Sequence, residues 1–281
     1  MSENVVHLPK IAVLGAGSMG RAVMSGLLKP DVHVDGGIVA TNRSAQRAAS
    51  LSRTDGVTAL ATDDDPNANR EAVAGAGIVL VAVKPAMVPD LLTEIADAIE
   101  PDAIVVSVAA GVPLARFKEL LPASVAAIRS MPNTPAIVGK AVTGLSAGTR
   151  STPEQVALVR RMFETVGTVV EVPESQLDAL STISGSGPAY VFFLIEQLTA
   201  AALDKGFTPE QAAQMVNGTF IGAAHLLEAS DSTPEQLRIQ VTSPKGTTER
   251  AVAVLQEADL KAVFDRATDA ALARARELAA G

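Results

Sequence analysis

The chain has 281 residues, 48% of them apolar, which is enough for about two domains that each bury a hydrophobic core. It contains no cysteine, and this excludes disulfide bonds, a thiolate nucleophile and cysteine-ligated metal sites. The formal net charge is −8 and lysine and arginine form no basic run, so we do not expect nucleic-acid binding.

Secreted, membrane-spanning and metal-binding proteins are not expected either. No signal peptide is recognisable, because the first residues lack a basic region followed by an apolar core, and a cytoplasmic location is the default expectation. The most apolar stretch, Tyr190 to Leu203, is shorter than the roughly 20 residues of a membrane span and contains Glu196. The three histidines are scattered, with no carboxylates at ligand spacing, so we expect no metal site.

The first motif is a buried strand, Lys10 to Leu14, that leads through a glycine-rich turn into a helical run, Arg21 to Leu28. In this order, backbone N–H groups and a helix N-terminus face an anion, most naturally the pyrophosphate of a dinucleotide. Gly15 would allow the tight turn, Gly17 the approach of the phosphates, and Gly20 close packing of helix on strand. The alternative is a purely structural turn. The predicted contacts are Gly15, Ala16, Gly17, Ser18, Met19 and Gly20.

The next strand, Gly37 to Thr41, indicates which dinucleotide is bound. An acidic residue at its end would bind the ribose 2′-hydroxyl of NAD, whereas an arginine accommodates the 2′-phosphate of NADP. The strand is followed by Asn42, Arg43 and Ser44 with no Asp or Glu, so NADPH is favoured over NADH. The alternative is that Asn42 or Ser44 only caps the next helix and that Arg43 is a solvated charge.

A third strand, Ile78 to Val83, is apolar throughout and is typical of a strand buried on both faces. It ends at Lys84 and Pro85, where ligands bind in open α/β sheets, at the carboxyl ends of central strands. Since Pro85 fixes the direction of the turn, we predict that Val83, Lys84 and Pro85 line the cofactor site. The alternative is a lysine that simply reaches water.

Strands and helices then alternate up to residue 172, which predicts a mostly parallel sheet with right-handed crossovers. The remaining predicted elements are a helix at 88–99, a strand at 103–107, a helix at 114–121, strands at 125–129, 141–147 and 167–172, and a helix at 153–165. The Pro- and Asn-rich loop 130–135 either faces the same crevice or serves as a linker.

From Pro173 onward the pattern is helical throughout. The predicted helices span residues 175–184, 187–205, 209–229, 234–241, 246–257 and 259–280. In the helix at 187–205, residues Val191 to Ile195 are apolar on nearly every side, whereas a surface helix shows one apolar stripe. We expect a second subunit to bury this helix in an interleaved homodimer.

Two segments of the helical half, Ser184 to Tyr190 and Val241 to Thr248, strongly resemble pyrroline-5-carboxylate reductase. The resemblance covers essentially the whole chain, because Gly15 to Gly20, Ala82 to Pro85 and Met131 to Pro135 have the same order and spacing in that family. The sequence departs from the family pattern at one visible position. The family usually has two glycines after Ser-Pro, and the first of them is Lys245 here.

This resemblance implies reduction of Δ1-pyrroline-5-carboxylate to L-proline by NADPH or NADH, the last step of proline biosynthesis. It implies a Rossmann-like domain over residues 1–172, a helical dimerisation and substrate domain over 173–281, and a ring of dimers such as a homodecamer. The loop from Ser243 to Thr248 would hold the substrate carboxylate, and Thr248 would hydrogen-bond the ring nitrogen. Asn69 and Lys84 would line the dinucleotide site.

The residues themselves are compatible with this chemistry. Gly246, Thr247 and Thr248 begin a helix, so their N–H groups can receive a carboxylate. Reduction of a cyclic imine can start from the protonated iminium, and no histidine or lysine–carboxylate pair marks the helical half as carrying an acid. Thr248 is therefore predicted to orient the substrate, with Ser243, Gly246 and Thr247 as further contacts. The alternative is that the two threonines only begin a helix.

Two rival functions remain at this point. A β-hydroxyacid dehydrogenase would place a catalytic lysine on the helix after its glycine-rich segment, but Tyr190 to Asp204 contains no lysine. A non-catalytic NADP-binding redox sensor would need the first half of the chain but would have no use for a second anion-binding helix start at Gly246.

Overall fold

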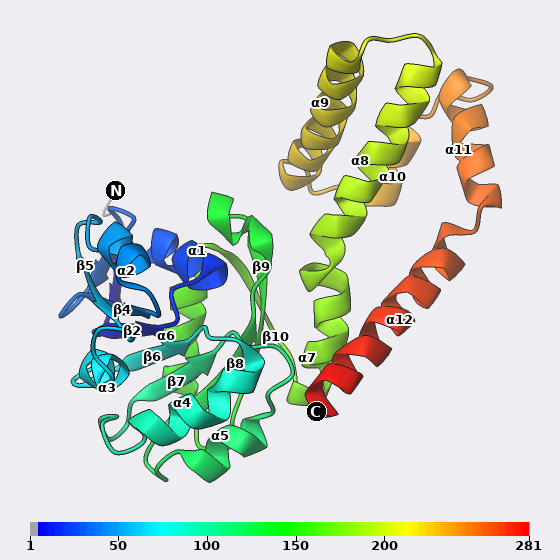
Figure 1. The fold of residues 1–281 in the computed structure, drawn as a ribbon. Helices are drawn as coiled ribbons and strands as arrows, with labels where there is room; N and C mark the ends of the chain where they lie inside the picture. Colours follow the sequence, from blue (N-terminus) through cyan, green and yellow to red (C-terminus); the bar gives the residue numbers. More distant parts are fainter. Residues whose placement is uncertain (1–4, 281) are drawn as a thin grey trace. The chain divides into compact units, whose positions relative to one another are not determined.

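An eight-stranded sheet organises the first part of the computed structural model, which describes residues 5–280 (Figure 1). The strand order is β10-β9-β8-β7-β6-β2-β4-β5, and only the pair β8–β9 is antiparallel. The strands are β2 (Ile11–Leu14), β4 (Ile38–Asn42), β5 (Val57–Ala61), β6 (Ile78–Val81), β7 (Ile104–Ser107), β8 (Ala126–Met131), β9 (Ala141–Ala147) and β10 (Gly167–Glu171). The predicted Rossmann-like, mostly parallel sheet is confirmed.

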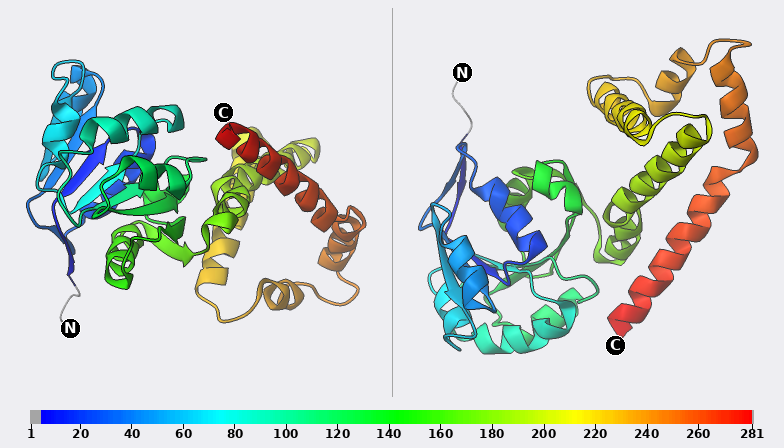
Figure 2. Two further views of the ribbon diagram at one scale, coloured as in Figure 1. Left: turned by 90° about the horizontal axis from the view of Figure 1, so that it is seen from below. Right: turned by 45° about the horizontal axis from the view of Figure 1, so that its top comes forward.

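Helices cover both faces of this sheet (Figure 2). Alternate residues of β2 point to opposite faces, so Ile11 and Val13 pack in one core and Ala12 and Leu14 in the other. The first core also receives α1 (Ser18–Leu27) and α6 (Pro153–Glu164), together with Leu51 of α2 (Ala45–Leu51). The second receives α3 (Ala68–Val73), α4 (Val88–Ile95) and α5 (Leu114–Leu120).

The strand register brings the carboxyl ends of four strands together. Leu14 at the end of β2 is paired with Thr41 of β4 on one side and Val81 of β6 on the other, and Val81 is paired with Ser107 of β7. The loops that follow these strands therefore begin at the same edge of the sheet. Ligands bind at this edge in open parallel sheets.

The structure adds local detail that the sequence pattern did not predict. Helix α1 begins at Ser18, three residues before the predicted start, because Gly17 is its N-cap residue. Strands β1 (Val6–Leu8) and β3 (Val32–Val34), which pair with each other, were not predicted, and neither was β5, which pairs with β4. These short strands depend on pairing with distant segments, and a local pattern carries no signal for that.

All regular elements after β10 in the described residues are helical, as predicted. They are α7 (Glu174–Leu180), a π-helical turn η3 (Ser181–Gly185), α8 (Gly187–Asp204), α9 (Pro209–Glu228), α10 (Pro234–Gln240), α11 (Thr247–Glu257) and α12 (Leu260–Ala280).

One sequence motif, Thr-Pro-Glu-Gln, begins α6, α9 and α10. In α6 the hydroxyl of Thr152 accepts a hydrogen bond from the N–H of Gln155, and the Gln155 side chain accepts one from the N–H of Thr152. The same reciprocal pair begins α9 and α10. This capping box satisfies backbone N–H groups that a helix start leaves without partners.

By their contacts the residues form two compact units. The sheet unit contains the residues up to Ser186 together with the end of α12 from Ala271, and the helical unit is Gly187–Ala270. The predicted domain boundary between residues 172 and 173 stays a prediction. Within residues 5–280 no helix is both long and apolar enough to cross a membrane.

Candidate functional site

A cavity of about 370 Å³ lies in the sheet unit where β2, β4 and β6 end. Its lining includes seven of the residues predicted to bind a dinucleotide: Gly15, Gly17, Asn42, Arg43, Asn69, Val83 and Lys84. These residues come from the glycine-rich turn, the end of β4, the start of α3 and the segment after β6. The fold thus brings together residues that are up to about 70 positions apart in the sequence.

The three glycines of the turn differ in what the protein requires of them. Gly15 has φ +82°, and a Cβ atom there would lie 2.7 Å from Val83 Cγ1, so only glycine fits. A Cβ at Gly20 would come within 3.3 Å of the Gly15 carbonyl oxygen, where α1 packs on the strand. At Gly17 the nearest atom would be 3.9 Å away. The protein leaves the space beside Gly17 free, as close approach of a phosphate would require.

The end of β4 holds the glycine-rich turn in place. The N–H of Gly15 donates to Thr41 Oγ1 at 3.2 Å, and the N–H of Ala16 donates to the Thr41 carbonyl at 2.8 Å. The buried side chain of Asn42 donates from Nδ2 to the Ala16 carbonyl at 3.0 Å. Asn42 therefore supports the turn with its amide nitrogen. Sequence reasoning missed Thr41, although a hydroxyl residue ending the strand beside a glycine-rich turn was a usable signal.

Five predicted cofactor residues do not line the cavity with their own atoms: Ala16, Ser18, Met19, Gly20 and Pro85. Met19 packs against the core, and Pro85 begins a 3-10 turn, η1 (Pro85–Met87). The start of α1 has neither a side-chain cap nor an acidic residue in its first turn. The N–H groups at the start of α1 are therefore left without side-chain partners, as an anion-binding helix start requires.

The cavity contains both cationic and anionic groups. Arg43, which precedes α2, is joined in the lining by Arg47 of the first turn of α2, a residue that the sequence analysis did not predict. Neither arginine forms an ion pair within the described part of the chain. Asp90 and Glu94 of α4 also line the cavity and were not predicted. Asn69 donates from Nδ2 to both carboxylate oxygens of Glu94, at 3.1 and 3.2 Å.

The predicted substrate residues lie together in the helical unit, at the start of α11. Gly246 is the N-cap residue, no side chain caps the helix, and the N–H of Gly246 donates to the Ser243 carbonyl at 3.0 Å. A Cβ at Gly246 would come 2.9 Å from that carbonyl oxygen. Thr247 and Thr248 are exposed in the first turn. The predicted roles of these residues stay predictions.

Lys245 adopts the backbone conformation that favours glycine. Its φ is +61°, in the left-handed region, and its N–H donates to Glu249 Oε2 at 2.9 Å. A side chain in this region costs on the order of 1 kcal/mol. The loop therefore keeps a glycine-like turn although a lysine occupies the position.

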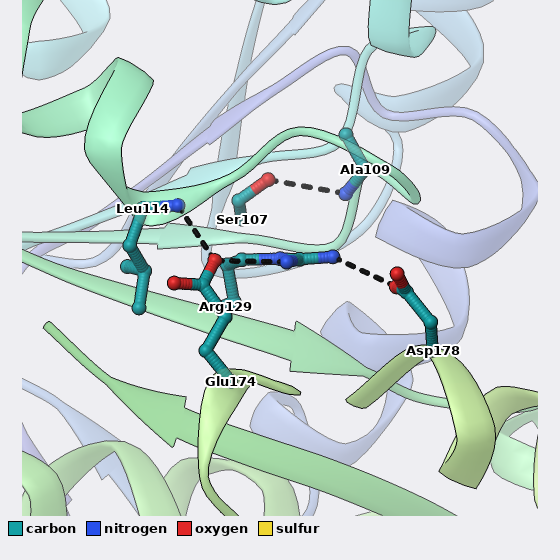
Figure 3. Close-up of polar contacts among 6 residues, drawn as sticks. All are labelled: Ser107, Ala109, Leu114, Arg129, Glu174 and Asp178. Atoms are coloured by element: carbon teal, nitrogen blue, oxygen red, sulfur yellow. Dashed lines mark hydrogen bonds and ion pairs between the residues drawn. The ribbon is translucent and has the colours of Figure 1, made fainter. Parts of the chain in front are cut away.

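A buried ion-pair network fixes α7 and α5 to the sheet (Figure 3). Arg129 of β8 donates to Glu174 Oε1 at 2.8 Å and to Asp178 Oδ1 at 3.3 Å, both on α7. The same Glu174 oxygen accepts the N–H of Leu114, the first residue of α5, at 2.7 Å. Sequence reasoning did not predict this network. No group of three or more His, Asp or Glu residues within 5–280 is placed to hold a metal ion.

Comparison with protein families gives two matches. Residues 174–278 match the family model described as pyrroline-5-carboxylate reductase dimerisation. Residues 10–111 match the model described as NADP oxidoreductase coenzyme F420-dependent. The second match contains every residue that lines the cavity in the sheet unit.

Individual proteins match over nearly their full length. A pyrroline-5-carboxylate reductase of Mycobacterium tuberculosis is 37% identical, over 96% of this chain and 97% of the relative. One of Corynebacterium melassecola is 36% identical, over 95% and 98%. Among solved structures, a pyrroline-5-carboxylate reductase of Coxiella burnetii has a TM-score of 0.88 at 35% identity, over 95% of this chain and 97% of the other. The chain belongs to the pyrroline-5-carboxylate reductase family.

Proposed function

We propose that this protein reduces Δ1-pyrroline-5-carboxylate to L-proline, by hydride transfer from a reduced nicotinamide dinucleotide, as the last step of proline biosynthesis. Family membership over nearly the whole chain is the observation that carries the proposal. The chain is an oxidoreductase of an NAD(P)-dependent family, and the cavity at the glycine-rich turn is its cofactor site. The cytoplasmic location expected from the sequence stays a prediction.

The cofactor supplies the hydride, and the residues of the chain bind and orient the cofactor and the substrate. Gly15, Gly17 and the uncapped start of α1 receive the pyrophosphate. Arg43 and Arg47 lie in the same cavity without carboxylate partners in the described residues, which supports a preference for the 2′-phosphate of NADPH.

The start of α11 binds the substrate. The N–H of Gly246 is already bonded to the Ser243 carbonyl, so the N–H groups of Thr247 and Thr248 receive the carboxylate. This helix start lets an anion bind to an acidic protein. The hydroxyl of Thr248 hydrogen-bonds the ring nitrogen. Because the iminium form already carries the proton, Thr248 orients the ring for hydride attack and need not act as an acid.

The working enzyme is an interleaved homodimer. None of the residues of α8 is buried in the chain by itself, and Phe192 and Phe193 are 61% and 58% exposed. An apolar cavity of about 800 Å³ is lined by α8, α9 and α10. Exposed apolar surface of this extent is typical of a subunit interface, and the family model matched here describes dimerisation. A ring of dimers, such as a homodecamer, extends the same proposal.

The test is spectrophotometric. Pyrroline-5-carboxylate is added with NADPH or NADH, and the loss of reduced-nicotinamide absorbance is followed together with L-proline formation. We expect turnover with both cofactors and a higher kcat/KM with NADPH. Thr248→Val should lower kcat/KM by about 10- to 100-fold, because one hydrogen bond to a charged group is lost. No turnover of this substrate, or efficient oxidation of β-hydroxyacids with NADP, would contradict the proposal.

A further inference from the structure

The amide of Asn69 has a defined orientation in the cofactor cavity. Its Nδ2 atom lies 3.1 and 3.2 Å from the two carboxylate oxygens of Glu94, and both side chains are partly buried in the cavity wall. A carboxylate offers only acceptors, so the amide atom facing it must be the NH₂ group. The carbonyl oxygen, Oδ1, is then the amide atom left for the cavity.

A second contact holds the backbone of Glu94 in place. Arg70, the neighbour of Asn69 on α3, donates from Nη1 to the Glu94 carbonyl at 2.7 Å and is paired with Asp97 just beyond α4. These contacts fix the backbone at Glu94 against α3. The Glu94 side chain therefore meets Asn69 from a constrained position.

The charge of Glu94 is unfavourable for the cavity's own ligand. A dinucleotide is a polyanion, and a carboxylate in the wall of its site repels it. If charge were the only effect of Glu94, neutralising it would tighten cofactor binding. The contact with Asn69 is the feature of Glu94 that can offset this repulsion.

We propose that Glu94 is a positioning residue that holds Asn69 with its carbonyl oxygen toward the cavity, where it accepts a hydrogen bond from a neutral donor of the dinucleotide. The neutral donors on the adenosine part of NADPH are the adenine amino group and the ribose 3′-hydroxyl, because the 2′ position carries the phosphate. The inference rests on the proposed cofactor site and adds the residue that sets its hydrogen-bonding pattern.

Glu94→Gln tests whether the Glu94 side chain strengthens or weakens cofactor binding. A glutamine can accept from or donate to Asn69, so the amide is free to turn over and only part of the population presents the acceptor. We expect the Kd of NADPH, measured by calorimetry on the full-length protein, to rise about two- to fivefold. The matched control is Glu119→Gln, which neutralises an exposed carboxylate of the sheet unit outside this cavity and should leave this Kd unchanged. Unchanged or tighter binding in Glu94→Gln would overturn the proposal.

A double-mutant cycle separates positioning from a general structural role. In an Asn69→Ala background there is no amide to orient, so adding Glu94→Gln should no longer weaken NADPH binding. Equal weakening in both backgrounds would overturn the proposal in favour of a packing role, and thermal melts of all variants check the fold. A wild-type protein that binds neither NADPH nor NADH would refute the proposed function instead.

The donor is assigned with an etheno-adenine analogue of NADPH, which lacks the amino group. If Glu94→Gln still weakens binding of the analogue, the acceptor contacts a ribose hydroxyl. If the variant weakens only NADPH, the acceptor contacts the adenine amino group. Either result supports an oriented acceptor, whereas tighter binding of both ligands to the variant would contradict it.

Discussion

The sheet unit and the helical unit differ in how far each buries its apolar side chains within one chain. Strands β2, β6 and β7 are buried along their whole length between two cores, and buried Thr41 and Asn42 fix the turn of the cofactor site. In the helical unit, by contrast, the most apolar helix, α8, contains no buried residue. A single chain thus builds the cavity of the proposed cofactor site, whereas the helical unit leaves large apolar side chains exposed.

The largest expected effect comes from charging that apolar surface. Phe192→Asp should convert the oligomer into monomers and abolish reductase activity, because an aspartate cannot be buried unpaired in an apolar interface. The Kd of NADPH should stay within about twofold of wild type if the sheet unit builds its site alone. Sedimentation velocity and calorimetry measure the two quantities.

A matched control for this substitution is Val5→Asp, which charges an exposed apolar residue of the sheet unit. This control should leave the oligomer intact. Loss of NADPH binding in Phe192→Asp would show that the sheet unit does not build its cofactor site alone.

The next largest effect is on the stability of the sheet unit, through the ion-pair network of Arg129. Arg129→Met should lower the free energy of unfolding by about 3 kcal/mol, because it leaves two partly buried carboxylates, Glu174 and Asp178, without their cation. Chemical denaturation measures the change, with the exposed pair Arg116–Glu119 as a comparison, where Arg116→Met should cost below about 1 kcal/mol. Equal losses in the two variants would show that burial of the network is not what matters.

A smaller effect separates two glycines in one turn. Gly15→Ala should cost about 2 kcal/mol of stability, because the backbone is left-handed and the added Cβ meets Val83. Gly17→Ala should leave the melting temperature unchanged and raise the Kd of NADPH about tenfold or more, because only the ligand uses that space. Unaltered NADPH binding by Gly17→Ala would argue against phosphate contact at this turn.

The smallest effect is a pH dependence that both units share. The backbone N–H of Glu154 and the hydroxyl of Thr152 hold the pKa of the Glu154 carboxyl below its ordinary value, and Glu210 in α9 has the same arrangement with Thr208. A carboxyl whose folded-state pKa is depressed stabilises the fold above its unfolded pKa, and this contribution is lost as pH falls through the folded value. Melting temperatures of Glu154→Gln and Glu210→Gln should therefore lie below wild type at neutral pH and converge with it only in acid, as the pH falls below the ordinary glutamate pKa and through the depressed folded-state value.

The sequence predicted those parts of the molecule whose causes are local. Consecutive apolar residues in 11–14 and 78–81 marked central strands, and the glycine-rich turn and Pro-Asn loop marked positions where the backbone conformation is restricted. The Thr-Pro-Glu-Gln motifs also begin helices by a purely local capping arrangement.

The unpredicted features depend on pairing between distant residues. Asn69 and Glu94 are 25 residues apart, and Arg129 and Glu174 are 45 apart. Nothing in the neighbourhood of either carboxylate indicates its partner, because strand order and register decide which side chains meet. Resemblance to a family supplied the position of Asn69 but not the residue that orients it.

In the proposed reaction, hydride passes from the nicotinamide ring to the imine carbon of Δ1-pyrroline-5-carboxylate. The most direct measurement uses NADPH deuterated at the transferable position of C4, with the proline product analysed by NMR. We expect L-proline with one deuterium at Cδ, the ring carbon that is bonded to nitrogen and does not carry the carboxylate. Unlabelled proline, or consumption of NADPH without proline, would contradict it.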